Sequence, residues 1–246
     1  MFINKIIKKI KTNFLKRYSP DIVFRYLPVV DIIKKYKIPA SNILEVGSGD
    51  FGITKYIGRT VVGIDIIFGD FGDNLLKKVI YDGEIIPFKD NNFDTLISVD
   101  SLEHIIYEKR GAMIKEMIRV TDGFIVLIFP EGTLASRQDN NLDKLFIAKK
   151  NFRSAFLKEH VENGLPKSDD IINYFLSVSN KKISLVYQKR YLNLGIRNIY
   201  MRLSISNSPF FRGAYYLFLL LVPLRNLLNF GRCYREMLVI KVENNK

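Results

Sequence analysis

The sequence predicts an α/β fold in which helices cover both faces of a mainly parallel, seven-stranded sheet. Two observations predict it. Short apolar runs alternate along the chain with segments of helical spacing, and the runs are continuously apolar, as in strands buried on both faces. The chain has 246 residues, of which 48% are hydrophobic and 26% charged, so it can bury one large core and is not expected to be disordered.

Seven runs rich in apolar and β-branched residues are predicted to be the strands. Five come early, at residues 42–46, 60–65, 77–81, 94–99 and 123–129, and two come late, at 182–192 and 234–243. In such sheets ligands bind outside the carboxyl ends of the strands. Motifs that directly follow strands are therefore the ones expected to carry function.

Helical spacing is clearest over residues 103–120, where four apolar side chains share one face: Ile106, Met113, Met117 and Val120. Residues 142–166 are interpreted as a helical insertion. A capped amphipathic helix is expected to follow, with Ser168, Asp169 and Asp170 at its start.

The first 18 residues place apolar side chains on one side of a predicted helix and lysines on the other; the apolar set is Phe2, Ile3, Ile6, Ile7, Ile10 and Phe14. Because lysines interrupt the apolar residues, this segment is not expected to be a secretory signal. We interpret residues 1–40 as a basic N-terminal helical extension and 41–246 as the main domain. Insertions are expected at about 131–166 and 193–233.

The net charge of +13 is unevenly distributed: +8 over residues 1–40, −6 over 41–135 and +11 over 136–246. Two interpretations stay open. The flanks are solvated faces of a lysine-rich chain, or they meet an anionic surface such as phospholipid headgroups, phosphorylated acceptors or nucleic acid.

The single cysteine, Cys233, excludes an intrachain disulfide. The chain has no Cys/His pairs at the spacing of metal ligands, so the sequence does not predict a metal site. A reduced, cytoplasmic compartment is the default expectation.

Three strand ends carry candidate binding motifs. After the first strand, ILEVGSGDFG supplies glycines that allow the backbone a tight turn and a close approach to a ligand. The second strand ends at Asp65, an acid suited to two ribose hydroxyls. Asp82 follows the third strand, before an apolar Ile86-Pro87-Phe88 turn suited to a flat base. Together they indicate a nucleoside site.

The glycine pattern alone also fits a nicotinamide dinucleotide fold, and the x-x-Gly spacing to Gly52 keeps that alternative open. Glu45 argues against it, because a carboxylate beside the turn repels a pyrophosphate and attracts a cation. Gly52 is expected only to permit close helix–strand packing, and Asp94 to cap a turn. For Glu103 the expected role is a helix N-terminal carboxylate.

Four stretches, at residues 43–52, 61–66, 81–105 and 113–130, resemble successive motifs of the class I S-adenosylmethionine-dependent methyltransferases, and more narrowly the type-11 family. The resemblance covers about a third of the chain. It implies a Rossmann-like sheet whose last strand is antiparallel, and S-adenosylmethionine as cofactor. It further implies that Glu45 orients the methionine ammonium, that Asp65 binds the ribose, and that Asp82 lies at the adenine. The implied cofactor-binding residues are Glu45, Gly47, Ser48, Gly49, Asp65, Ile66, Asp82, Gly83, Asp100 and Ser101.

Methyl transfer from a sulfonium requires alignment, exclusion of water and, for some acceptors, removal of a proton. The chain contains two histidines, and both are candidate catalytic residues. His104 follows the fourth strand, near the expected methyl position. His160 lies after the fifth strand, in the region that shapes the acceptor pocket in this family. For each, a structural role is the alternative.

An apolar run extends from Gly213 to Leu224, which is too short for a transmembrane helix of about 20 residues. It either packs in the core or lies in a membrane interface, flanked by Arg212, Arg225 and Arg232. Together with the N-terminal segment, it makes peripheral contact with an anionic membrane a hypothesis.

The sequence thus indicates a cytoplasmic methyltransferase acting on a hydroxyl of a glycan, a lipid-linked sugar or a small molecule. One alternative is a non-catalytic membrane- or nucleic-acid-binding module that retains the fold. Another is a nucleic-acid methyltransferase, which the basic flanks favour. No Asn/Asp-Pro-Pro-aromatic motif of amino-base methylation follows the fourth strand, so nucleic acid is the less favoured acceptor.

Overall fold

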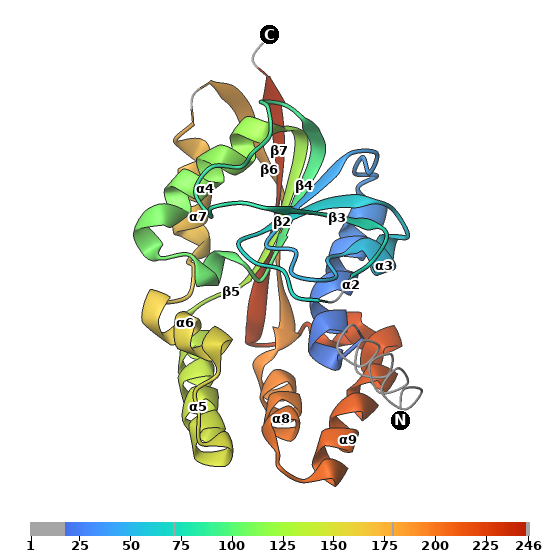
Figure 1. The fold of residues 1–246 in the computed structure, drawn as a ribbon, viewed down its shortest axis with the longest axis vertical. Coiled ribbons are helices and arrows are strands. Elements are labelled where there is room, and N and C mark those ends of the chain that lie inside the picture. Colours follow the sequence, from blue (N-terminus) through green and yellow to red (C-terminus); the bar gives the residue numbers. More distant parts are fainter. Residues whose placement is uncertain (1–17, 71, 179, 245–246) are drawn as a thin grey trace.

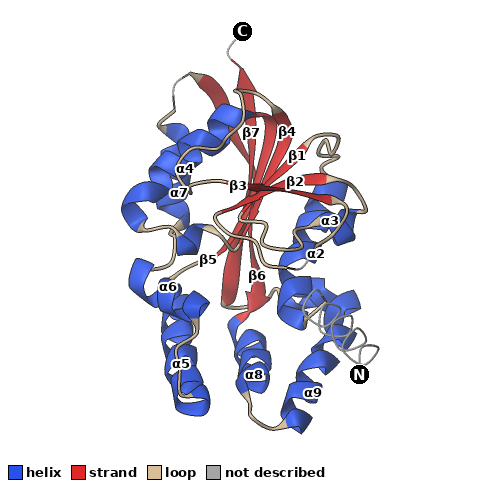
Figure 2. Ribbon diagram, viewed as in Figure 1, coloured by secondary structure: helices blue, strands red, loops and turns tan. Residues whose placement is uncertain are grey.

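A computed structural model of the chain, describing residues 18–70, 72–178 and 180–244, is built around one seven-stranded sheet (Figures 1 and 2). The strands are β1 (Ile43–Val46), β2 (Val61–Asp65), β3 (Leu76–Ile80), β4 (Phe93–Val99), β5 (Thr121–Pro130), β6 (Lys181–Asn193) and β7 (Cys233–Asn244). Their order across the sheet is β3-β2-β1-β4-β5-β7-β6. Only β7 runs against its neighbours β5 and β6. The predicted fold class, including the antiparallel last strand, is confirmed.

The helices of the described residues are α2 (Pro20–Lys35), α3 (Thr54–Ile57), α4 (Tyr107–Val120), α5 (Thr133–Lys150), α6 (Ala155–Asn163), α7 (Ser168–Leu176), α8 (Leu194–Ile205) and α9 (Pro209–Leu217), with two 3-10 helices, η1 (Leu102–His104) and η2 (Phe218–Leu228). Helix α7 begins where predicted, with Asp169 and Asp170 in its first turn. The Ser168 side chain does not cap it: its hydroxyl is buried without a hydrogen-bond partner among the described residues.

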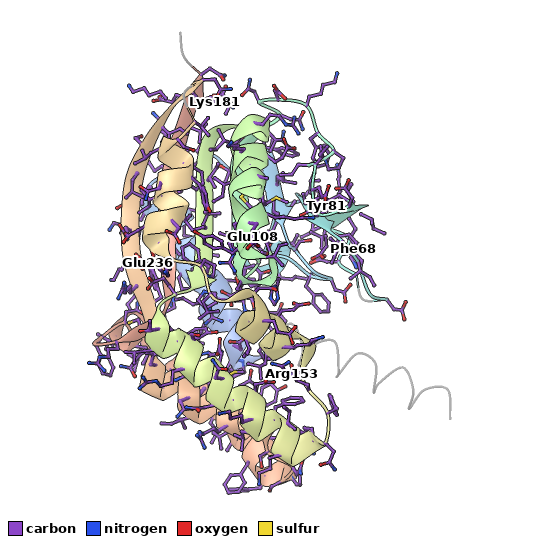
Figure 3. The ribbon with its side chains drawn as sticks, turned by 90° about the vertical axis from the view of Figure 1, so that its left-hand side faces the viewer. Phe68, Tyr81, Glu108, Arg153, Lys181 and Glu236 are labelled. Carbon is purple, nitrogen blue, oxygen red and sulfur yellow. The ribbon has the colours of Figure 1, made fainter. Side chains whose placement is uncertain are left out.

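Helices pack on both faces of the sheet (Figures 1 and 3). On the face seen in Figure 3, α4 and α7 share a core with one side of the strands. Helix α2 covers the other face, where Val29 is fully buried. Met113, Met117 and Val120 of α4 are buried as predicted. Ile106 is not: it is 45% exposed, because its extended backbone precedes the first helical residue, Tyr107.

Helices α5, α8 and α9 extend beyond the end of the sheet at which β5 leads into α5 and β6 into α8 (Figure 1). They form a third core around Leu142, Tyr200, Tyr215 and Leu228. They fall within the predicted insertions, 131–166 and 193–233, whose boundaries stay predictions. The predicted amphipathic segment at the N-terminus lies almost wholly outside the described residues. Helix α2, within the predicted extension 1–40, packs directly on the sheet.

The predicted apolar run forms the end of α9 and the start of η2, and it divides its side chains between two environments. Tyr215 is buried in the third core. Several large apolar side chains of this region are exposed: Phe210, Phe211, Leu217, Leu220, Leu224, Leu227 and Phe230. We call these seven the apolar ridge. No helix in the described part of the chain has the length and hydrophobicity needed to cross a membrane.

Candidate functional site

The glycine loop after β1 brings the ends of three strands together. The backbone amide of Gly47 donates to the carbonyl of Ile64 in β2 over 2.9 Å. Gly47 has a φ of +73°, and a Cβ there would lie 1.6 Å from the Ser101 hydroxyl oxygen at the end of β4. Glycine is therefore required, because both the left-handed backbone and the close approach exclude a side chain. In contrast, a Cβ on Gly49 would meet no described atom within 4 Å.

Glu45 is fully buried in β1, directly under this loop. Its carboxylate accepts hydrogen bonds from the Tyr26 hydroxyl at 2.9 Å and from the Ile53 backbone amide at 2.7 Å. Burial raises the pKa of Glu45 to about 7, although these two hydrogen bonds oppose the shift. A Cβ on Gly52 would lie 2.4 Å from Glu45 Oε2. Gly52 therefore also makes room for the acid, beyond the packing role expected of it.

Asp65, at the end of β2, holds the loop from the other side. One carboxylate oxygen accepts from the Gly49 amide at 2.9 Å, and the other from the Ile66 amide at 2.8 Å. The Ile66 side chain is 64% exposed beside it. Carboxylate oxygens accept more than one hydrogen bond each, so Asp65 retains capacity for a ligand.

The loop after β3 lies at the same edge of the sheet. Asp82 accepts hydrogen bonds from the backbone amides of Glu84 and Ile85, which lower its pKa. Gly83 has a φ of +83°. The preceding residue, Tyr81, lies at this edge in Figure 3. Ile86 is buried, and its amide is bound by Glu116, so the apolar turn is fixed to α4.

Asp100, after β4, is bound by arginines from both ends of the chain. Its carboxylate accepts from Arg235 Nε at 2.9 Å and Nη2 at 2.6 Å, and Arg25 Nε lies 3.4 Å away. Burial alone raises the pKa of Asp100, but Arg235 and Arg25 hold it below its usual range. Asp21 joins this network through Arg235 at 3.1 Å. The carboxylate predicted to contact methionine is therefore already engaged in an ion network, which the sequence did not predict.

The two histidines lie together although 56 positions separate them in the chain. Their ring centroids are 5.1 Å apart. His104 Nδ1 lies 2.5 Å from Glu159 Oε2, and His160 Nδ1 lies 2.8 Å from Asp139 Oδ2. His160 is buried, whereas the side chain of His104 is 34% exposed. Burial, and then the neighbouring His160, lowers the pKa of His104, which favours a neutral imidazole.

Asp139 connects this pair to the end of the sheet. Besides His160, its carboxylate accepts from the Tyr234 hydroxyl at 2.7 Å and from Arg197 Nη1 at 2.7 Å. The Arg197 guanidinium stacks 3.4 Å over the Tyr234 ring. These contacts fix the orientation of the His160 ring.

Glu103 lies between the Asp100 network and the histidines. It is fully buried, and neither carboxylate oxygen has a hydrogen-bond partner among the described residues. Its Oε1 is 3.7 Å from His160 Nε2. Burial and then the charge of Asp100 raise the pKa of Glu103 well above its usual range. Glu103 does lie in the first turn of a short helix, η1, as expected, but its carboxylate is fully buried.

Asp94 has a structural role, close to the expected one. Its carboxylate accepts from the Ser41 hydroxyl and from the Asn42 amide, joining the start of β1 to β4. The predicted cofactor-binding residues lie at or just after the carboxyl ends of β1 to β4, as expected, whereas His160 lies on α6. Sequence reasoning missed Tyr26, Arg25 and Arg235. The only available signal was the charged pair Arg235-Glu236 inside an otherwise apolar strand.

Solved structures with the same fold include several methyltransferases. The YcgJ protein of Bacillus subtilis superposes with a TM-score of 0.54 at 13% identity, covering 88% of this chain and 98% of that one. The MccD protein superposes with a TM-score of 0.50 at 17% identity, covering 88% and 96%. A putative sarcosine dimethylglycine methyltransferase of Galdieria sulphuraria gives 0.50 at 11% identity, covering 86% and 83%. At these identities the likeness is one of fold, that of the class I methyltransferases.

The sequence comparison finds a family model that matches part of the chain. Residues 44–127 match the model of a methyltransferase domain of the type-11 family. This segment, about a third of the chain, is therefore similar to the class I S-adenosylmethionine-dependent methyltransferases, and it carries the strand ends described above. An uncharacterised protein of Methanocaldococcus jannaschii is 25% identical over 142 residues, 54% of this chain. The match spans 60% of that relative's length.

Proposed function

We propose that this chain binds S-adenosylmethionine at the carboxyl ends of β1 to β4 and transfers its methyl group to a hydroxyl of an acceptor. One observation carries the proposal: the buried Glu45 carboxylate lies under a glycine loop that is open above Gly49 and tied to Asp65. A buried carboxylate is costly unless a partner compensates it. The two hydrogen-bond donors to Glu45, the Tyr26 hydroxyl and the Ile53 amide, are uncharged. The ammonium of the cofactor would supply the opposite charge.

In this proposal the remaining residues contact different parts of the cofactor. Asp65 would bind the ribose hydroxyls, with Ile66 packing beside it. Asp82 and Gly83 would contact the adenine, and Gly47, Ser48, Gly49 and Ser101 would line the methionine portion. Asp100 would act less directly than its position suggests, because its carboxylate is engaged by Arg235. The cofactor supplies an activated methyl group, and this chain would align the acceptor and exclude water.

The histidine pair would serve the acceptor. His104 and His160 follow the strand ends at which the methyl group is expected, and His104 is partly exposed. A hydroxyl requires removal of its proton, and a neutral imidazole held by a carboxylate is suited to receive it. This favours a hydroxyl acceptor over one that needs no base.

The apolar ridge supports an acceptor carried on a lipid, such as a lipid-linked sugar. Its seven exposed side chains lie on α9, η2 and the loop that follows, with the exposed Arg212 and Arg232 close in sequence. An apolar surface bordered by cations fits the headgroup layer of an anionic membrane. A soluble glycan or small molecule is the acceptor if the ridge binds no membrane.

Isothermal titration with S-adenosylhomocysteine tests the cofactor proposal. Asp65→Ala is expected to weaken binding by about 2 kcal/mol, the scale of hydrogen bonds in a charged pair. Asp70→Ala is the matched control, because Asp70 is exposed five positions further on. Equal affinity of the Asp65 variant and the wild type, or tighter binding of NAD than of the adenosyl ligand, would contradict the proposal.

A further inference from the structure

We propose that Glu103, His104 and His160 form a binding site for one divalent transition-metal cation beside the acceptor position. One ligand atom from each side chain lies within 4.8 Å of the other two. At Zn²⁺–ligand distances of about 2.1 Å, neighbouring tetrahedral ligands lie about 3.4 Å apart. The 3.7 Å between Glu103 Oε1 and His160 Nε2 is close to that value.

Both imidazoles are held in the way that metal-bound histidines are. Such histidines present one ring nitrogen to the metal and donate the other N–H to a carboxylate or carbonyl. Here Nδ1 of His160 is held by Asp139 and Nδ1 of His104 by Glu159. This leaves the Nε2 lone pair of each ring as the ligand. Two independent carboxylates thus fix both rings.

The third ligand explains an otherwise costly feature. Glu103 is completely buried, and its two oxygens lack hydrogen-bond partners among the described residues. A buried carboxylate without partners is strongly disfavoured, whereas a coordinated cation would compensate it. The acid faces the histidine pair, since its Oε1 lies 3.7 Å from His160 Nε2.

The two segments that carry the ligands are fixed to each other. Arg110 of α4 donates from Nε to the carbonyls of Leu102 and Ile105, which flank Glu103 and His104. Its Nη2 donates to the carbonyls of Asn163, the last residue of α6, and of Gly164. Asn163 in turn donates to the His104 carbonyl at 2.9 Å. The positions of η1 and α6 are therefore set before any cation binds.

Three protein ligands leave a coordination position for another group, as in catalytic rather than structural sites. With a cation bound, neither imidazole would be free to take the acceptor proton; the cation would instead coordinate the acceptor hydroxyl and lower its pKa, so that it loses its proton more readily. The binding site stands on the geometry alone. Its role in activating the acceptor rests on the proposed function.

The test is metal binding by the full chain, produced without a histidine tag and stripped with a chelator. The chain has only two histidines and one cysteine, so competing sites are few. Equilibrium dialysis with Zn²⁺ is expected to give one equivalent per chain, and Co²⁺ is expected to give the visible bands of a low-coordinate site. Zn²⁺ should also raise the melting temperature.

Variants separate a site from surface binding. His104→Ala is expected to weaken Zn²⁺ binding by about 100-fold or more, and Glu159→Gln by about 10- to 100-fold, as for the groups that orient metal ligands. Glu162→Gln is the matched control, because its side chain on α6 is half exposed and bound to Arg153. His104 is partly exposed, so its variant tests the site even if substitution of the buried Glu103 prevents folding.

Two outcomes would overturn the metal site: a wild type that binds neither ion, or a His104→Ala variant that binds both as well as the control. Titration with S-adenosylhomocysteine in the stripped protein keeps the two proposals apart. Normal binding of that ligand without metal binding removes only the metal site. Metal binding without it removes the proposed function and leaves the site.

Discussion

The substitution Glu45→Gln separates two effects of the Glu45 charge: the destabilisation of the fold that its burial causes, and its proposed role in binding the cofactor. Glutamine has the same shape and can keep both neighbours: its oxygen can accept from the Ile53 amide, and its NH₂ group can donate to the Tyr26 hydroxyl oxygen. The substitution therefore removes the charge without opening a cavity. Any pH-dependent difference between the two proteins then reports on the ionisation of Glu45.

The expected magnitude follows from the pKa. Burial raises it from 4.5 to about 7 in the folded chain. An acid with a raised folded pKa destabilises the fold as it ionises, so its cost is absent below the unfolded value and complete above the folded one. At 1.36 kcal/mol per pKa unit, the cost to the wild type grows by about 2 to 3 kcal/mol between about pH 5 and pH 8.

Urea unfolding of both proteins across this range measures the difference. The free energy of unfolding of the variant, relative to the wild type, is expected to rise by that amount from the lower to the higher pH. All other groups titrate equally in both proteins and cancel. Parallel stability profiles would refute the reasoning, because Glu45 would then keep its ordinary pKa in the fold.

The same variant tests the ammonium site. Loss of a charged partner is expected to weaken S-adenosylhomocysteine binding by about 10-fold or more at pH 8. In the wild type, affinity should fall as the pH drops below about 7, because ligand binding must then displace the proton on Glu45. In the glutamine variant this pH dependence should be absent. A variant that binds as tightly as the wild type would remove Glu45 from the site.

Two further substitutions test the loop and the surface. Gly47→Ala should destabilise the fold by about 2 kcal/mol more than Gly49→Ala, since both have positive φ but only the first collides with Ser101; equal losses in urea unfolding would contradict this. Leu220→Asp should lower retention on anionic vesicles by about tenfold or more at low salt. The matched control is Ile80→Asp, similarly exposed on β3, and equal retention of both variants would remove the membrane proposal.

The sheet was predictable because each strand can be recognised from its own residues. Strands such as β1 and β4 are buried on both faces, so nearly every residue is apolar and the run is visible without any knowledge of its neighbours. The edge of the sheet at which we propose that the cofactor binds was predictable for a related reason. Each of its acids and glycines directly follows a strand, and parallel strands place their carboxyl ends at one edge.

The proposed acceptor side could not be predicted in the same way, because its contacts join distant segments. Asp100 meets Arg25 from α2 and Arg235 from β7, which lie 75 and 135 positions away. The meeting of His104 with His160 depends on how α6 packs against η1. Sequence spacing does not encode such packing, so each histidine was identified singly and the burial of Glu103 between them was missed.

These long-range contacts also alter the meaning of the charge pattern. The acidic middle third and the basic flanks suggested an anionic partner, but part of the imbalance is neutralised inside the fold. Asp100 of the middle third is bound by one arginine from each flank, and Asp139 is bound by Arg197. Even Arg225, expected to border a membrane, is paired with Asp31 at 2.6 Å. Net charge is therefore weak evidence for contact with a membrane. The membrane proposal depends instead on the apolar ridge, whose seven side chains are left exposed by the other described parts of the chain.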